Sequence, residues 1–115
     1  MFKQLFSSLL GAQDPTTNVD VTQARALQQE GAQLIDVRET SEFRSGHAKG
    51  ARSIPLSQLK QRIGEIKPDK PVLVICQSGS RSRSAQSILL QQRLTDVRNV
   101  LGGTSAWRRA GLPMQ

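Results

Sequence analysis

A single cysteine, Cys76, has the clearest potential for covalent chemistry in this 115-residue chain. It directly follows the apolar residues 71–75 and opens the run Cys-Gln-Ser-Gly-Ser-Arg-Ser at residues 76–82, after which a helical pattern begins. A strand, a short Gly/Ser loop and a helix start bring backbone N–H groups and the positive end of the helix dipole to the thiol. Such surroundings favour the thiolate, the reactive form of cysteine. The sequence therefore predicts a nucleophile, and the alternative is a small buried side chain at a strand end.

The residues after Cys76 could bind an anion beside the sulfur. Gly79 allows a tight turn in which successive N–H groups face the thiol. Arg81 carries paired N–H donors that match an oxyanion. Asp36 and Arg38 follow another apolar segment and have two open roles, bracing the strand end through hydrogen bonds or contacting the substrate directly.

The charge balance also indicates an anionic partner. The chain has 16 Lys and Arg against 9 Asp and Glu, a net charge of +7. Such a surface attracts anions, and a small anion drawn to Cys76 fits it, although arginines that serve only solubility are the simpler explanation for most positions. Nucleic acid is not expected as a partner, because aromatic residues make up only 3% of the chain and single-strand binders stack bases on aromatic side chains.

Length, cysteine content and hydropathy limit the class of protein. A chain of 115 residues forms one domain. One cysteine excludes an internal disulfide, so we expect a reducing compartment, the cytoplasm. The apolar runs are all shorter than the roughly 18 residues needed to cross a bilayer, so no transmembrane helix is expected.

Strand and helix patterns alternate along the chain. Strands are predicted at residues 18–21 and 32–37, at a segment ending with Cys76, and at 97–101; helices are predicted at 22–30, 39–44, 57–66 (one or two short ones), 81–94 and 104–109. Such alternation is typical of a parallel sheet covered on both faces. In these sheets the ligand site lies at the carboxyl ends of the strands, where residues 36–38 and Cys76 stand.

The first residues form a separate segment. Apolar side chains at positions 2, 5, 6, 9 and 10 predict a short amphipathic helix, so we divide the chain into residues 1–14, a helix and linker, and residues 15–115, the domain. Docking of this helix onto the domain is the favoured interpretation. Contact of residues 1–10 with a membrane surface, or self-association, is the less favoured alternative.

Three groups of motifs, in register, resemble the rhodanese family. Asp36-Val37-Arg38, Glu42-Phe43, Gly46-His47, Gly50-Ala51 and Ile54-Pro55-Leu56 match its first homology segment, residues 76–82 match its active-site loop, and Gly102-Gly103, Ala106-Trp107, Gly111 and Pro113 match its closing segment. The chain thus resembles a single-domain rhodanese over residues 18–113. The resemblance implies an α/β fold with a five-stranded parallel sheet flanked by helices on both faces.

The resemblance also implies a sulfurtransferase that needs no cofactor and no metal. The Cys76 thiolate would attack the outer sulfur of a small anionic donor such as thiosulfate, and sulfite would leave. The loop residues Gln77, Ser78, Gly79, Ser80 and Arg81 would hold the anionic sulfur and the donor, with Ser82 in support. Because the chain has no second cysteine, the persulfide must pass its sulfur to an external acceptor: a small thiol, cyanide or the thiol of a partner protein.

Two other functions stay open. A non-catalytic binding or sulfur-delivery module could keep the same fold. A cysteine-dependent phosphatase would place an arginine six residues after the cysteine, where this chain has Ser82. By resemblance, this shorter loop is the kind that handles sulfur. His47, the only histidine, is expected to hold a turn rather than act as a base, and Gln77 replaces an arginine often found in relatives.

Overall fold

The computed structural model describes residues 17–115, so the helix predicted near the N-terminus, and with it the proposed division at residue 14, lies outside the described residues. The elements are β1 (Asn18–Val19), α2 (Val21–Gln29), β2 (Gln33–Asp36), α3 (Thr40–Arg44), β3 (Arg52–Ser53), two 3₁₀ turns (Leu56–Gln58 and Ile63–Glu65), β4 (Val72–Ile75), α4 (Ser80–Gln91), β5 (Val97–Val100) and α5 (Gly103–Arg109). Within residues 17–115, no helix has the length and hydropathy that crossing a bilayer requires.

The five strands form one parallel sheet in the order β1-β5-β4-β2-β3. This confirms the predicted fold class. The chain leaves β2 toward β3 and leaves β4 toward β5, in opposite directions across the sheet. A crevice opens between the carboxyl ends of two such strands, and ligands bind there in open α/β sheets.

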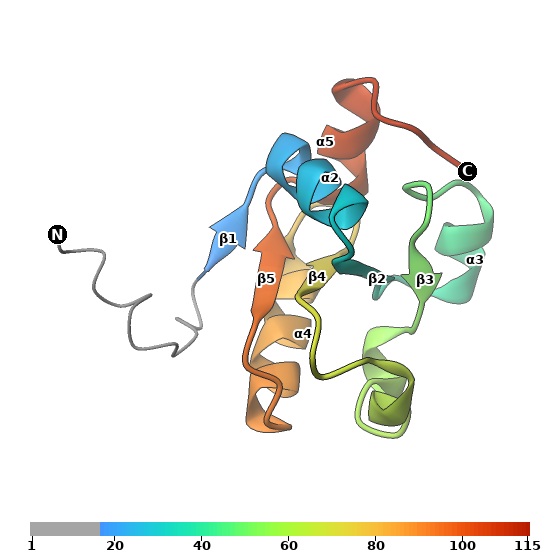
Figure 1. Ribbon diagram of the computed structural model, residues 1–115. Helices are drawn as coiled ribbons and strands as arrows, with labels where there is room; N and C mark the ends of the chain where they lie inside the picture. Colours follow the sequence, from blue (N-terminus) through green and yellow to red (C-terminus); the bar gives the residue numbers. More distant parts are fainter. Residues whose placement is uncertain (1–16) are drawn as a thin grey trace, which may run out of the picture.

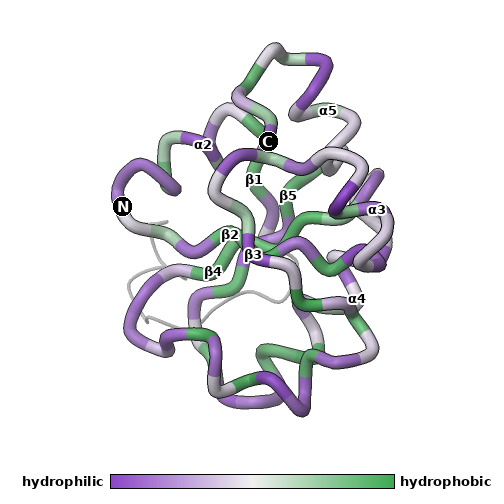
Figure 2. The backbone as a smooth tube through the Cα atoms, turned by 90° about the vertical axis from the view of Figure 1, so that its right-hand side faces the viewer, coloured by the Kyte–Doolittle hydropathy of each residue, from purple (hydrophilic) through white to green (hydrophobic). Residues whose placement is uncertain are grey.

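Helices cover both faces of this sheet (Figure 1). In β4 all four residues are buried, and alternate ones face opposite sides. Val72 and Val74 pack with α4 and the 3₁₀ turns, whereas Leu73 and Ile75 pack with α2 and α5. The central strands β2 and β4 are among the more hydrophobic segments of the chain (Figure 2), as strands buried on both faces require.

Most predicted boundaries differ from the structure by a single residue, and two differ by more for local reasons. The strand predicted at residues 18–21 ends at Val19, because Asp20 caps α2: its carboxylate accepts a hydrogen bond from the Gln23 N–H, and the Gln23 side chain accepts one from the Asp20 N–H. The helix predicted to reach residue 94 ends at Gln91. Arg93 has a φ of 72°, which turns the chain toward β5.

Candidate functional site

Cys76 lies at the carboxyl end of β4 with only 1% of its surface exposed. The chain then turns through Gly79, whose φ of 113° few other residues adopt, and enters α4. This turn points the Gly79 N–H at the sulfur, with 3.1 Å between N and Sγ. The sequence prediction of a turn that aims backbone donors at the thiol agrees with this geometry.

The surroundings of Cys76 favour its ionised form. Burial by itself raises the pKa of the thiol, but a hydrogen bond with the Ser82 side chain and hydrogen bonds from the N–H groups of Ser82, Gly79 and Ser78 outweigh it. The net effect holds the pKa of Cys76 below its ordinary value of 9.0. A larger fraction of the thiol is therefore ready for nucleophilic attack at neutral pH.

Ser82 connects the sulfur to a residue that sequence reasoning missed. Its buried hydroxyl lies 3.3 Å from Cys76 Sγ and donates to Asn99 Oδ1 at 2.5 Å. Asn99 belongs to β5 and is itself fully buried. The available signal was an amide in the predicted strand 97–101, whose other residues apart from Arg98 are apolar.

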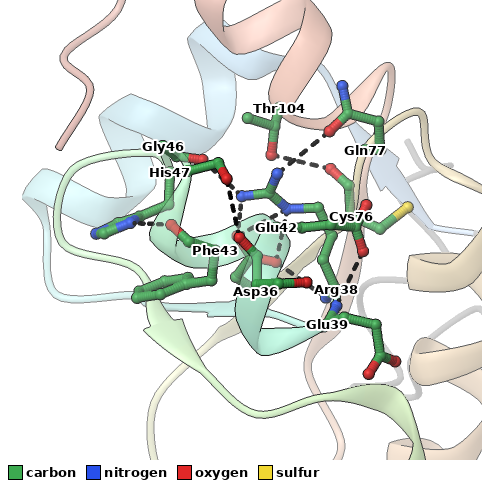
Figure 3. A network of polar contacts seen from close by, with 12 residues as sticks. Asp36, Arg38, Glu39, Glu42, Phe43, Gly46, His47, Cys76, Gln77 and Thr104 are labelled. Carbon is green, nitrogen blue, oxygen red and sulfur yellow. Dashed lines mark hydrogen bonds and ion pairs between the residues drawn. The ribbon is translucent and has the colours of Figure 1, made fainter.

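Arg38 and Asp36 brace the carboxyl end of β2 (Figure 3). Both are buried, and the Arg38 guanidinium donates to both Asp36 carboxylate oxygens, at 2.8 to 3.1 Å. It also donates to the Gly46 carbonyl at 2.9 Å and to Gln77 Oε1 at 3.2 Å. The Cys76 sulfur points away from this network in Figure 3. This arrangement fits the bracing role rather than direct contact with a substrate.

Arg81 is engaged by a carboxylate. Its two terminal nitrogens donate to the two oxygens of Glu42, at 2.7 and 2.9 Å, and both side chains are about one-third exposed. Hydrogen bonds from Arg81 and from the Glu39 N–H, aided by the charges of Arg81 and Arg38, lower the pKa of Glu42 to about 2. The predicted role of Arg81 in orienting a donor stays a prediction, since a donor would share this guanidinium with Glu42.

The remaining loop residues lie at the surface. Gln77, Ser78 and Ser80 are exposed. The Gln77 amide accepts from Arg38 and donates to Ser105 Oγ at 2.8 Å, so it links the loop to both β2 and α5. Gln77 is thus a neutral connector between the loop and its neighbours.

The start of α5 fixes the loop from the other side. The Thr104 N–H and hydroxyl both donate to the Cys76 carbonyl, at 2.8 and 3.0 Å, and the Ser105 N–H donates to the Gln77 carbonyl at 3.1 Å. These bonds use N–H groups that a helix start leaves free. Gly103 lies against the same peptide, and a Cβ there would be 2.7 Å from the Gln77 carbonyl carbon.

His47 has the surroundings of a structural residue. Its Nδ1 lies 2.8 Å from the Phe43 carbonyl oxygen, and its ring stacks on Phe43 with 3.6 Å between centroids (Figure 3). Its backbone pairs with Gln115 through two hydrogen bonds. These contacts fit the expectation that His47 holds a turn.

A family model described as a rhodanese-like domain matches residues 20–110. The chain belongs to the rhodanese-like domain family. This confirms the resemblance found in the sequence motifs. The match includes β4, the Cys76 loop, α4 and α5.

Individual relatives agree with this assignment. The rhodanese-like chain is 36% identical to thiosulfate sulfurtransferase GlpE of Vibrio cholerae over 89% of its own length and 97% of that protein. It is 54% identical to the uncharacterized protein YqhL of Bacillus subtilis over 66% of its own length, and this match spans only 60% of YqhL. The crystal structure of a thiosulfate sulfurtransferase from Pseudomonas aeruginosa superposes with a TM-score of 0.79 at 26% identity, over 87% of this chain and 20% of that one.

Proposed function

We propose that this rhodanese-like domain is a sulfurtransferase that carries sulfane sulfur as a persulfide on Cys76. The observation that best supports the proposal is the buried thiol at the end of β4, with a backbone N–H directed at its sulfur and a hydroxyl oxygen 3.3 Å from it. GlpE, which matches over nearly all of its length, is named a thiosulfate sulfurtransferase. We expect the reaction to need no cofactor and to take place in a reducing compartment such as the cytoplasm.

The reaction has two displacement steps. In the first, the Cys76 thiolate attacks the outer sulfur of the donor, the sulfur–sulfur bond of the donor breaks, and sulfite leaves with the electron pair when the donor is thiosulfate. In the second, a thiolate or cyanide attacks the outer sulfur of the persulfide, and Cys76 leaves as a thiolate. Because Cys76 is the only cysteine of the chain, the acceptor must be another molecule. Small thiols, cyanide and the thiol of a partner protein all meet this requirement.

The N–H groups of the loop act in both steps. Each step has an anionic sulfur on Cys76 at its beginning or end, and preorganised donors stabilise such an anion without having to reorient. No general base is required once the thiolate has formed. This accords with the place of His47, whose ring stacks on Phe43 and whose Nδ1 lies beside the Phe43 carbonyl.

Intact-mass measurement tests the proposal directly. The wild-type protein and a Cys76→Ser variant are treated with thiosulfate or with an organic persulfide and desalted without reductant. We expect a gain of one sulfur atom in the wild type alone, removed by cyanide. An equal gain in Cys76→Ser, or no gain with either donor, would contradict the proposal. The second result would favour a rhodanese fold kept for binding.

The role of Arg81 has a separate test. We expect Arg81→Ala to lower kcat/KM for thiosulfate more than for an uncharged donor, because the guanidinium can pair with an anionic donor. Arg83→Ala is the matched control, since Arg83 is exposed two residues further along the same helix. Equal losses for charged and uncharged donors would contradict this role.

A further inference from the structure

Asn99 is a buried amide in the middle of the sheet, between β1 and β4. Burying an amide costs several kcal/mol unless it is hydrogen-bonded. Its Oδ1 accepts from the Ser82 hydroxyl at 2.5 Å, and its Nδ2 donates to Asn18 Oδ1 at 3.3 Å and to the Gly79 carbonyl at 3.4 Å. Ser82 and Gly79 also have polar groups in contact with the Cys76 sulfur. The Asn99 amide is therefore hydrogen-bonded to both Ser82 and Gly79.

Counting hydrogens shows that Asn99 and the sulfur compete for the same donor. A serine hydroxyl carries one hydrogen and can donate it to one acceptor at a time. While Cys76 is a thiol, all groups are satisfied: the S–H donates to Ser82 Oγ, and the Ser82 hydroxyl donates to Asn99 Oδ1. When Cys76 is a thiolate, it has no hydrogen to give and needs the hydroxyl hydrogen itself. The hydroxyl must then turn away from Asn99.

The Ser82 hydroxyl is within hydrogen-bond distance of both partners. A separation of 2.5 Å is at the short end of the range for a hydroxyl that donates to an oxygen, and 3.3 Å is an ordinary hydrogen-bond distance to the larger sulfur atom. If the hydroxyl hydrogen stays on Asn99, the thiolate faces an oxygen lone pair. If it turns, the buried Asn99 oxygen loses its donor. Either way Asn99 makes the ionised sulfur less favourable.

We propose that Asn99 is a positioning residue that acts through Ser82, holding its hydroxyl hydrogen while Cys76 is protonated and releasing it when the sulfur becomes an anion. The proposal rests on Cys76 being the nucleophile. In this role Asn99 restrains the reactivity of the resting thiol. The N–H groups of the loop supply the opposite, activating effect.

The charged groups around the sulfur do not depend on Asn99. Arg81 on α4 is paired with Glu42 on α3, and Arg38 is paired with Asp36 at the end of β2. A change of the Asn99 side chain leaves these charges in place. A shift in the ionisation of Cys76 in an Asn99 variant would therefore be carried by hydrogen bonding through Ser82.

The rate of Cys76 alkylation by iodoacetamide, measured against pH, tests the proposal. Since the chain has one cysteine, the reaction reports this thiol alone. We expect Asn99→Val to lower the pH of half-maximal rate and to speed alkylation at neutral pH roughly three- to tenfold, the value of one hydrogen bond. Asn99→Ala should shift in the same direction, and it serves if the valine variant does not fold. Ser82→Ala should shift the profile the opposite way, because the thiolate loses a donor.

A double-mutant cycle separates this role from a merely structural one. In the Ser82→Ala background, Asn99→Val should leave the pH profile unchanged. Gln86→Leu is the matched control. Gln86, on α4, is also a buried amide, but it donates to the carbonyls of Thr17 and Val97. It should lower thermal stability without moving the profile. An upward shift or no shift in Asn99→Val, or the same shift with and without Ser82, would overturn the proposal.

The outcome is independent of the sulfurtransferase assignment. Alkylation needs only the thiolate and no sulfur donor. A shifted alkylation profile together with no sulfur gain in the mass measurement would overturn the proposed function and support the role of Asn99. A sulfur gain on Cys76 together with an unchanged alkylation profile in Asn99→Val would support the proposed function and overturn the role of Asn99.

Discussion

Replacing Gly103 with alanine should disrupt the Cys76 loop from a position outside it. Gly103 is buried and has a φ of 57°, and a Cβ there would be 2.7 Å from the carbonyl carbon and oxygen of Gln77 and closer still to the carbonyl oxygen of Cys76. These neighbours are backbone atoms, so they cannot swing aside as a flexible side chain would. The added methyl group must therefore push α5 and the loop apart.

The expected cost can be estimated from two contributions. An alanine in the left-handed region costs about 1 kcal/mol, and overpacking a tight site typically costs about 1–3 kcal/mol more. The free energy of unfolding should thus fall by about 3 kcal/mol, which corresponds to a drop in Tm on the order of 10 °C. Since domains of this kind are stable by only about 5–15 kcal/mol, this is a large fraction.

Two other glycines separate backbone strain from steric overlap. Gly111 has a φ of 73° but nothing within 4 Å of a Cβ, so Gly111→Ala should cost about 1 kcal/mol from strain alone. Gly64 has neither a positive φ nor a neighbour within 4 Å, so Gly64→Ala should be neutral or stabilise by about 0.5 kcal/mol. The three variants differ in one property at a time.

Urea unfolding and Cys76 alkylation provide the two readouts. We expect stability to rank Gly64→Ala, Gly111→Ala, Gly103→Ala, from most to least stable. Only Gly103→Ala should raise the pKa of the Cys76 thiol, because only there does the methyl group displace the loop. If Gly103→Ala costs no more than Gly111→Ala and leaves the alkylation profile unchanged, the close packing of α5 does not hold the loop and the reasoning is refuted.

Two further predictions concern the ion pairs beside the loop. The pKa of Glu42 is about 2 in the folded protein, below its value in an unfolded chain, so its pair with Arg81 stabilises at neutral pH and this contribution is lost as pH falls from about 4.5 toward 2. For a pair about one-third exposed we expect this contribution to be about 1 kcal/mol. Urea unfolding from pH 4.5 toward 2 should show a smaller fall in the free energy of unfolding for Glu42→Gln than for the wild type. Equal dependence on pH in the two proteins would contradict the assignment. Asp36→Asn should cost about 3–5 kcal/mol, because it leaves the buried Arg38 without its anion. Adding Arg38→Met should recover part of that loss, and no recovery would show that the charge is not the cause.

The alternation of strand and helix patterns was enough to predict the sheet. Val72 to Ile75 form a continuous apolar run, as a strand buried on both faces must. The patterns predicted four strands, and the fifth, β3, followed only from the resemblance to the rhodanese family; the structure confirms all five. Errors at boundaries arose where one residue decides the local conformation, as Asp20 does by capping α2 and Arg93 does through its positive φ.

The partners of the site residues could not be predicted in the same way. Glu42 and Arg81 are 39 positions apart, and Ser82 and Asn99 are 17 apart. A linear pattern shows the type of each residue but not which side chains meet across the ends of neighbouring strands. Glu42 was recognised only as part of a motif, and its effect on the charge of Arg81 depends on a contact that only the folded chain makes.

The depth of Cys76 also limits what could take sulfur from it. With 1% of the residue exposed, a persulfide would bring its outer sulfur only about 2 Å nearer to solvent, the length of one S–S bond. A cysteine recessed in a broad, flat protein surface would be stopped by the rim of the loop before its sulfur came within reach. If Cys76 carries sulfur as proposed, delivery to a protein would require a thiol on a protruding loop or a flexible tail. This geometric limit would apply before any chemical preference between acceptors.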